Sequence, residues 1–308
     1  MFIAVSCGDE EATPANSYNA IIANSPNVKR MGDTSTASNG TVITMGDIQA
    51  VSEGNTDLRQ AAARLEIPRL KGGDRNLFIV HTLNDKSLNY CVEWSYDQKA
   101  QYWSAFRWDR TNSGGSAGYS GNFDEDPLIP SQYRTTLSDH YNNGYDRGHI
   151  VASADRQQSK EANQQTFYLS NMQPQLNGFN SNNGNSNWYT LENRLRKIYN
   201  TNGFRDTLYV VKGGTISEGK YTMKKGLPVP SYFFMAVLCK KNSVIKNNGY
   251  FAIGYWMKHE SNSDTSTRNY AVSINRLEEL TGIDFFCNLP DDIEEKIESS
   301  LSLSEWKY

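Results

Sequence analysis

The sequence is poor in several features that would assign it to a specialised class of protein. It has four cysteines and four histidines in 308 residues, and no two cysteines are close enough in sequence to form a paired zinc-binding motif, so we expect no structural zinc site. No apolar run approaches the roughly eighteen residues that a membrane-spanning helix needs. The formal charge of -3 gives the whole chain no attraction to a polyanion, so any electrostatic steering must come from a local patch.

Most of the cysteines and histidines lie in sequence surroundings that suggest no catalytic or metal-binding role. Cys91, Cys239 and Cys287 lie in apolar or strand-like runs, and three thiols form at most one disulfide, so buried free thiols are expected. The other three histidines have no ligand partner at short spacing and are predicted to be structural: His81, His140 and His259.

The N-terminus is similar to the end of a bacterial lipoprotein signal. A short apolar stretch and a small residue precede Cys7, and an acidic run follows it. This pattern predicts export and a lipid on Cys7 that anchors the chain at the cell envelope, the alternative being a free cysteine in a flexible tail. The next stretch, to about Gln60, is rich in small and polar residues and is predicted to be a tether. We therefore divide the chain into a signal remnant and tether, 1–60, and one domain, 61–308.

The domain has the pattern of an α+β fold. Strands are predicted at 77–82, 89–96, 102–108, 208–211, 232–239, 250–256 and 270–274, because each run is rich in β-branched and aromatic residues. The second and third are expected to form a hairpin across Asp97 and Gln98. Short helices are predicted at 275–280 and 291–301. The expected architecture is a central antiparallel sheet flanked by helices.

One four-residue segment places three kinds of polar chemistry together. Asp146-Arg147-Gly148-His149 holds a carboxylate, a guanidinium and an imidazole, which suit phosphodiester hydrolysis: a base for water, a cation for phosphate oxygens and an acid that orients either. The structural alternative is a strand with an Asp–Arg ion pair and an incidental histidine, and a motif this short does not decide between them.

The segments that follow predict a ββα unit. Phe167 to Leu169 form a β-prone run closed by Pro174, and we predict a strand there. Further on, Trp188, Leu191, Leu195, Ile198 and Tyr199 recur at helical spacing, after three candidate N-caps, Asn185, Ser186 and Asn187. Glu192 and Arg196 are four residues apart and therefore share a face of this helix.

Together these segments resemble the DNA/RNA non-specific endonucleases, the ββα-metal (His-Me finger) nucleases that include secreted bacterial nucleases and mitochondrial endonuclease G. The matching segments are Asp146–His149, Leu169–Gln175, Phe179-Asn180, and Trp188 with Glu192 and Arg196. Weaker similarity extends over roughly 65–298. The resemblance implies a sequence-non-specific endonuclease that hydrolyses DNA and RNA.

The resemblance also implies a role for each matching residue. His149 corresponds to the general base, whose ordinary pKa near 6.5 leaves a neutral fraction at neutral pH. Arg147 and Arg196 correspond to phosphate-facing arginines, Glu192 to the acid that holds a metal-bound water, and Asn171 to a supporting asparagine. Asp146 completes the motif. The cofactor implied is one Mg²⁺, with Mn²⁺ as an alternative, held by a single asparagine oxygen and waters.

The metal-binding asparagine is where the sequence departs from the family pattern. Counting forward from Asn171 places it at Asn180, whereas counting backward from Trp188 places it at Gly184, which has no side chain. A short insertion between 181 and 187 explains the difference. We choose Asn180, and the alternatives are Asn183, Asn185 and Asn187. An upstream arginine of the family's site has three candidates, Arg107, Arg110 and Arg134.

Two other functions compete with a nuclease. One is a zinc hydrolase built on His149. Its weakness is that Asp146 is the only likely zinc ligand close by, whereas zinc sites usually have three protein ligands. The other is a lipid-anchored nucleic-acid-binding protein that keeps the scaffold without catalysis, favoured by the displaced metal loop. Basic residues on the predicted helix, Arg194, Arg196 and Lys197, are candidates for a local patch that attracts nucleic acid, whereas Lys224 and Lys225 are predicted to be solvated surface.

Overall fold

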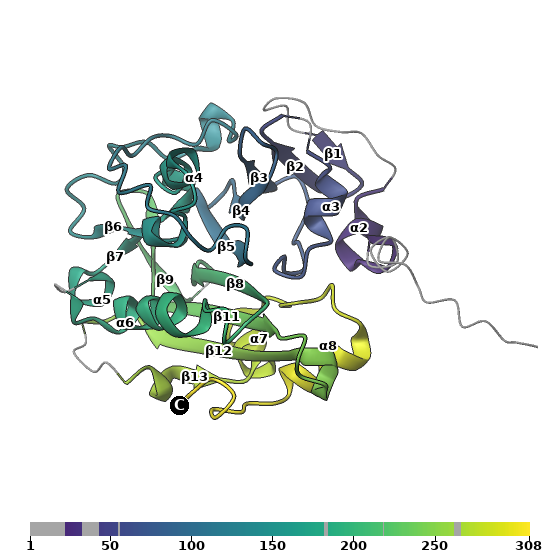
Figure 1. The fold of residues 1–308 in the computed structure, drawn as a ribbon. Coiled ribbons are helices and arrows are strands. Elements are labelled where there is room, and N and C mark those ends of the chain that lie inside the picture. The colour runs from purple at the N-terminus through teal and green to yellow at the C-terminus, as the bar shows by residue number, and fades with distance from the viewer. Residues whose placement is uncertain (1–21, 33–42, 55, 182–183, 218, 262–265) are drawn as a thin grey trace, which may run out of the picture.

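A nine-stranded sheet forms the centre of the computed structural model, which describes residues 22–32, 43–54, 56–181, 184–217, 219–261 and 266–308 (Figure 1). The strand order is β1-β2-β3-β4-β5-β8-β11-β12-β13. The strands are β1 (Ile43–Met45), β2 (Ile48–Ser52), β3 (Asn76–Thr82), β4 (Leu88–Ser95), β5 (Ala100–Trp108), β8 (Thr207–Gly214), β11 (Tyr232–Lys240), β12 (Tyr250–Lys258) and β13 (Ala271–Val272). Neighbouring strands are antiparallel except β2 and β3, which are parallel. The predicted α+β class with a central antiparallel sheet is therefore confirmed.

Helices cover both faces of this sheet, which explains why its inner strands are almost continuously apolar. On one face, the sheet packs against α6 (Asn187–Arg194). On the other, it packs against α3 (Leu58–Ala62), α7 (Ile274–Thr281) and α8 (Asp291–Glu298). Strand β8 shows the alternation: Leu208 and Val210 join the first layer, and Tyr209 and Val211 the second. A polar residue on such a strand therefore lies beneath a packed layer.

Smaller elements flank the sheet. Two two-stranded antiparallel sheets consist of β6 (Asp146–His149) with β7 (Met172–Gln175), and β9 (Tyr221–Lys224) with β10 (Leu227–Pro230). Three shorter α-helices also flank the sheet: α2 (Pro26–Arg30), α4 (Lys160–Gln165) and α5 (Asn177–Asn180). In Figure 1, β6, β7, α5 and α6 gather on the left side of the fold. Within the described ranges, no helix has the length and apolarity needed to cross a membrane.

Most of the predicted elements are present, with boundaries shifted by a few residues. The hairpin across Asp97 and Gln98 joins β4 and β5 as expected, and α7 and α8 occupy the two predicted helical segments. The strand predicted at 270–274 is reduced to β13, two residues long, because a helical turn precedes it and α7 begins at Ile274. Cys91, Cys239 and Cys287 are free and buried, as predicted.

The segment predicted as a tether contributes to the domain, so that prediction is wrong for part of its length. Strand β2 pairs in parallel with β3, and Ile48, Ala50 and Val51 are buried in the sheet. Although small and polar residues dominate this stretch, the apolar side chains of β2 are enough to bury it where it pairs with β3 at the edge of the sheet. Cys7 lies outside the described residues, so its lipidation stays a prediction.

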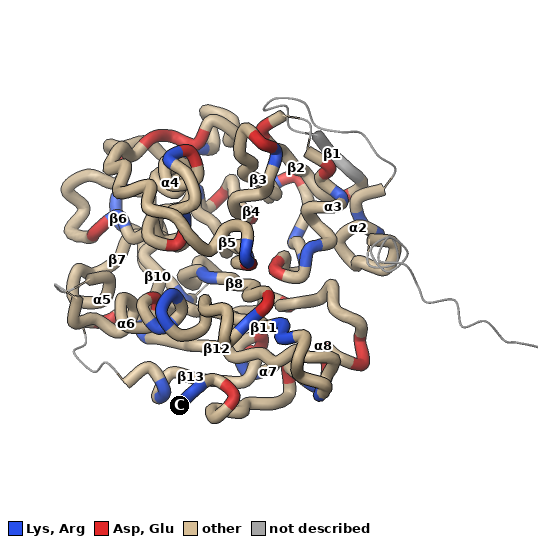
Figure 2. The backbone as a smooth tube through the Cα atoms, in the orientation of Figure 1, with Lys and Arg blue, Asp and Glu red and all other residues tan. Residues whose placement is uncertain are grey.

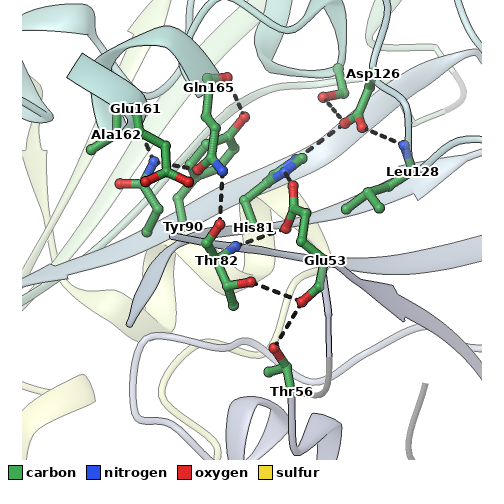
Figure 3. Close-up of polar contacts among 12 residues, drawn as sticks. Glu53, Thr56, His81, Thr82, Tyr90, Asp126, Leu128, Glu161, Ala162 and Gln165 are labelled. Carbon is green, nitrogen blue, oxygen red and sulfur yellow. Dashed lines mark hydrogen bonds and ion pairs between the residues drawn. The ribbon is translucent and has the colours of Figure 1, made fainter. Parts of the chain in front are cut away.

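A buried ionic cluster secures β2 to its neighbours (Figure 3). His81 of β3 is fully buried, with Nδ1 2.9 Å from Glu53 Oε1 and Nε2 3.1 Å from Asp126 Oδ2. Burial alone lowers the pKa of His81, but the charges of Asp126 and Glu53 outweigh it and raise the pKa to about 10. A protonated imidazole between two carboxylates links the end of β2, β3 and the loop at Asp126. The predicted structural role of His81 is consistent with these contacts.

Candidate active site

The ββα unit is assembled from β6, β7 and α6. Strand β6 runs antiparallel to β7, with His149 opposite Met172 and Asp146 opposite Gln175. The second strand was predicted at Phe167 to Leu169, and this is wrong: Leu169–Asn171 is a helical turn, and β7 begins at Met172 and contains Pro174. Proline is tolerated because this sheet has only two strands, so its missing N–H costs no further ladder bond.

Two side chains fix the unit, Gln173 against the large sheet and Asn171 against the segment after His149. The Gln173 amide donates to the carbonyl oxygen of Gln101 at 3.0 Å and accepts from the backbone N–H of Gly214 at 2.7 Å. The Asn171 side chain accepts from the Val151 N–H and donates to the Val151 carbonyl, both at 2.9 Å. Asn171 therefore fixes the chain just after His149. Through these bonds to the Val151 backbone, Asn171 can support the position of His149 without touching its side chain.

The helix begins where one of the predicted caps stands. Ser186 is the N-cap, and its hydroxyl accepts from the backbone N–H of Tyr189 at 3.2 Å. After Arg194, the helix continues as a π-helical turn, Leu195–Tyr199. Trp188, Leu191 and Leu195 are buried in the core, which confirms the predicted apolar stripe.

His149 is held in an aromatic recess. Its ring lies edge-on to Phe167 with centroids 4.8 Å apart, and 5.8 Å from the ring of Phe123. Nε2 is buried and has no hydrogen-bond partner within the described chain. Burial, and next the charge of Lys212, lower the pKa of His149 to about 4. The imidazole is therefore neutral at physiological pH, with a ring nitrogen free to accept a proton.

Beside His149 lies a buried cluster of two acids and two cations. Glu192 Oε1 is 2.9 Å from Lys212 Nζ, and Glu192 Oε2 is 3.8 Å from Arg196. Asp155 bridges the same cations, at 2.9 Å from Arg196 and 3.2 Å from Lys212. Burial alone raises the pKa of Asp155, but the charges of Lys212 and Arg196 outweigh it and lower the pKa below its usual value. The ion pairs thus bring two carboxylates and two cations together in one cluster.

Asp146 connects the His149 strand to the asparagine-rich loop. Its Oδ2 accepts from Asn180 Nδ2 at 3.1 Å and from Asn177 Nδ2 at 3.0 Å. This arrangement orients the Asn180 amide so that its oxygen is the atom left for another ligand. A carbonyl oxygen of this kind is a donor that suits Mg²⁺.

The other candidate asparagines are placed differently. Asn187 is buried, its Nδ2 donates to the Tyr270 hydroxyl at 2.7 Å, and its Oδ1 has no partner within the described chain. Asn185 is exposed, and Asn183 lies outside the described residues. Among the described residues, neither the Asn180 nor the Asn187 amide oxygen has a hydrogen-bond partner, but only Asn180 is hydrogen-bonded to the strand that carries His149.

Arg147 lies against Phe123, one of the two rings that surround His149. Its guanidinium lies 4.2 Å from the centre of the Phe123 ring, and it lines an open groove with Tyr141 and Lys225. Of the upstream candidates, Arg134 pairs with Glu125 at 3.4 Å and Arg107 with Asp109 at 3.4 Å. Neither pair includes a residue of the recess, and Arg110 is exposed; the upstream arginine therefore stays unassigned.

Sequence reasoning missed Lys212 and Asp155. A signal for Lys212 was present, because it follows Leu208 and Val210 at alternate positions of a strand and so points into the same buried layer. A lysine at such a position needs an acidic partner. Asp155 had no comparable signal, since its segment is a short helical turn without periodicity.

The recess fits a cation held by few protein atoms. Across the described ranges, no group of three or more His, Cys, Asp or Glu side chains could hold a metal ion. The candidate oxygen ligands for a metal ion are the Asn180 amide oxygen, which has no hydrogen-bond partner among the described residues, and the carboxylate of Glu192, which is 8% exposed. Oxygen donors of this kind, completed by water, match the preferences of Mg²⁺ rather than those of zinc.

A strand pair that carries a histidine, followed by a helix whose glutamate pairs with a lysine close enough to act on that histidine, has the arrangement of the ββα-metal nucleases. Comparison with known proteins agrees: residues 78–292 match the model of the DNA/RNA non-specific endonuclease family. The chain belongs to this family.

Individual relatives support the same conclusion. A nuclease of Nostoc sp. is 32% identical over 219 residues, which cover 69% of this chain and 76% of that protein. Nuclease C1 of Cunninghamella echinulata is 34% identical over 180 residues, 54% of this chain and 67% of that protein. Among solved structures, a chain of the EndoG/EndoGI complex superposes with a TM-score of 0.57 at 22% identity, covering 68% of this chain and 86% of that chain; this likeness concerns the fold.

Proposed function

We propose that the chain hydrolyses phosphodiester bonds of DNA and RNA without sequence preference, with His149 as the general base. The observation that carries the proposal is the buried Nε2 of His149, which has no hydrogen-bond partner among the described residues, close to the paired charges of Lys212 and Asp155. A neutral imidazole accepts a proton from water, and nearby cations favour the charge that develops on phosphate.

In the proposed reaction, His149 Nε2 takes a proton from a water molecule as the water oxygen forms a bond to phosphorus. The bond between phosphorus and the 3′ oxygen breaks, and that oxygen takes up a proton. Arg147 and Arg196 would supply fixed positive charge to the phosphate oxygens. Asn171 and Asp146 act as positioning residues, the first on the backbone after His149 and the second on Asn180.

The cofactor of this proposal is one Mg²⁺, or Mn²⁺ in its place. Asn180 would hold it through the amide oxygen, and Glu192 would hold a water bound to it. When bound, the cation neutralises charge on the phosphate and stabilises the leaving oxygen. This assignment requires Glu192 to exchange part of its contact with Lys212 for a water molecule.

A second function has one observation in its favour. Glu192 and Arg196 are already engaged in ion pairs with Lys212 and Asp155, as they would be in a protein that binds nucleic acid without cleaving it. Incubation of the purified protein with plasmid DNA and with RNA, in Mg²⁺ or in chelator, separates the two. A nuclease cleaves both substrates in Mg²⁺ and neither in chelator, whereas a binding protein shifts their mobility without cleavage.

We also propose export and lipid anchoring through Cys7, on the sequence pattern alone. The test is metabolic labelling with a radioactive fatty acid in a bacterial host, with Cys7→Ser as the matched variant. Label and membrane association are expected in the parent protein and absent from the variant; equal fractionation of the two would contradict the anchor.

A further inference from the structure

A groove beside the proposed active site has the chemistry of a nucleotide subsite. It has a volume of about 680 Å³, and its lining includes Phe123, Leu137, Tyr141, Arg147 and Lys225. Two of these residues are cationic and two aromatic, and no Asp or Glu is among the lining residues. Figure 2 shows acidic and basic residues interspersed along most of the described chain. A groove whose charged lining residues are all cationic is therefore a local feature.

The groove and the recess of His149 share the Phe123 ring. Phe123 lies 5.8 Å from the His149 ring on one side and 4.2 Å from the Arg147 guanidinium on the other. A strand whose phosphate faces His149 therefore has a path past Phe123 and Arg147 into the groove. The next groups it meets are Tyr141 and Lys225.

Tyr141 is available to a ligand. It is 60% exposed, which is unusual for so large a ring. Its carbonyl oxygen accepts from Lys225 Nζ at 2.8 Å, so the exposed ring and the ammonium are held at one edge of the groove. A ring and a cation side by side match a base and its phosphate.

Lys225 occupies a backbone conformation that favours other residues. It forms the β9–β10 turn with Gly226, and both have positive φ, 49° and 79°. Turns with this sign pattern favour asparagine and glycine, and a lysine there is strained. Strain of this kind gathers at functional sites. Strand β10 packs against β7, so the turn is fixed relative to the ββα unit.

We propose that this groove binds the nucleotide next to the scissile phosphate and favours single-stranded DNA or RNA over duplex. Tyr141 stacks on an unpaired base, and Lys225 and Arg147 bind the flanking phosphates. Stacking needs a base face that a duplex keeps covered, whereas phosphate contacts serve both forms. The inference rests on the proposed function for its location, but binding to the groove does not require catalysis.

Binding is therefore measured first, by fluorescence anisotropy of a labelled oligothymidylate and of a duplex of equal length, in chelator. Tyr141→Ala is expected to weaken single-strand binding about tenfold and duplex binding far less, while Tyr141→Phe keeps the ring and the affinity. Lys225→Ala should reduce the salt dependence, log K against log salt concentration, by about 0.7 for the single strand. Lys224→Ala removes an equal charge from an exposed neighbour outside the groove and should leave both affinities unchanged.

Lys225→Asn separates binding from folding. Asparagine adopts the turn conformation more readily, so the melting temperature should stay the same or rise while single-strand affinity falls. A purely structural lysine would give the reverse pattern. Equal loss on both substrates in Tyr141→Ala, or no loss on either, would overturn the inference.

Kinetics tie the groove to the proposed function. The ratio of kcat/KM on single-stranded DNA to that on bis(p-nitrophenyl) phosphate, which has no neighbouring nucleotide, is expected to fall about tenfold in Tyr141→Ala. A parent protein that binds the oligothymidylate but cleaves nothing would contradict the proposed function and leave the binding result standing.

Discussion

Lys212 Nζ lies 2.9 Å from Glu192 Oε1, in the buried layer between β8 and α6. Because Asp155 contacts the same ammonium at 3.2 Å, one lysine balances much of the negative charge of two acids that the sheet and helix bring together. The same charge lowers the pKa of His149. Lys212 thus connects the stability of the site to the protonation of the proposed base.

Removing this charge should destabilise the fold. Lys212→Met keeps much of the length and volume of the side chain but leaves Asp155 and Glu192 with only Arg196 between them. Loss of one partner from a buried ion pair costs about 3–5 kcal/mol of unfolding free energy, which urea denaturation measures. Adding Glu192→Gln removes one of the uncompensated acids and should recover part of the loss. Additive effects in the double variant would contradict the coupling.

The pH dependence of cleavage should report the environment of His149. Burial and Lys212 lower its pKa to about 4, so the base is neutral above that pH, and kcat/KM on single-stranded DNA should fall only as the pH drops through about 4. An acid limb near 6.5 would contradict this. In Lys212→Met the limb should move to higher pH, because a positive charge that opposes protonation is gone. Circular dichroism at each pH separates loss of fold from loss of catalysis.

Local pattern predicted the elements around the site, but the contacts between them needed the fold. The helix of Glu192 follows from short-range periodicity and capping, as Ser186 illustrates. The ion pair of Glu192 with Lys212 joins positions twenty residues apart, and no periodic pattern spans such a distance.

Two errors have a common physical cause. The β-prone residues Phe167 to Leu169 were predicted as a strand, yet Phe167 packs against His149, Tyr168 packs against His81, and Leu169 begins a helical turn. The segment around Ile48 was predicted as a tether, yet it pairs with β3. In both cases a tertiary partner decided the outcome over local propensity.

The buried cluster of His81 should make the fold sensitive to alkaline pH. The pKa of His81 is raised from 6.5 to about 10 by Asp126 and Glu53, against the effect of burial. The folded state therefore holds a proton that the unfolded state releases above 6.5, so its stabilisation is complete below 6.5 and is lost as the pH rises toward 10.

Urea denaturation at a series of pH values from 6 to 10 tests this linkage. The parent protein should lose unfolding free energy steadily across the range. His81→Gln should be less stable at pH 6, because it leaves the buried carboxylate of Asp126 and the partly exposed one of Glu53 without this cation, and its stability should depend less on pH above 6.5. Parallel curves for the two proteins would assign the pH dependence to other groups.

The register of the metal loop can be settled by two matched asparagine variants. In the part of the chain that the structure describes, neither amide oxygen has a hydrogen-bond partner, but Asn180 is bonded to Asp146 on the strand of His149, whereas Asn187 is bonded to Tyr270. Asn180→Ala should lower cleavage in saturating Mg²⁺ by two or more orders of magnitude, about 3 kcal/mol or more of transition-state stabilisation, and should raise the Mg²⁺ concentration needed for half-maximal rate. Asn187→Ala should lower the melting temperature and leave that concentration unchanged. If the two outcomes are exchanged, the ligand is Asn187 and the extra residues lie before it, and Asp146 then positions a loop without a metal ligand.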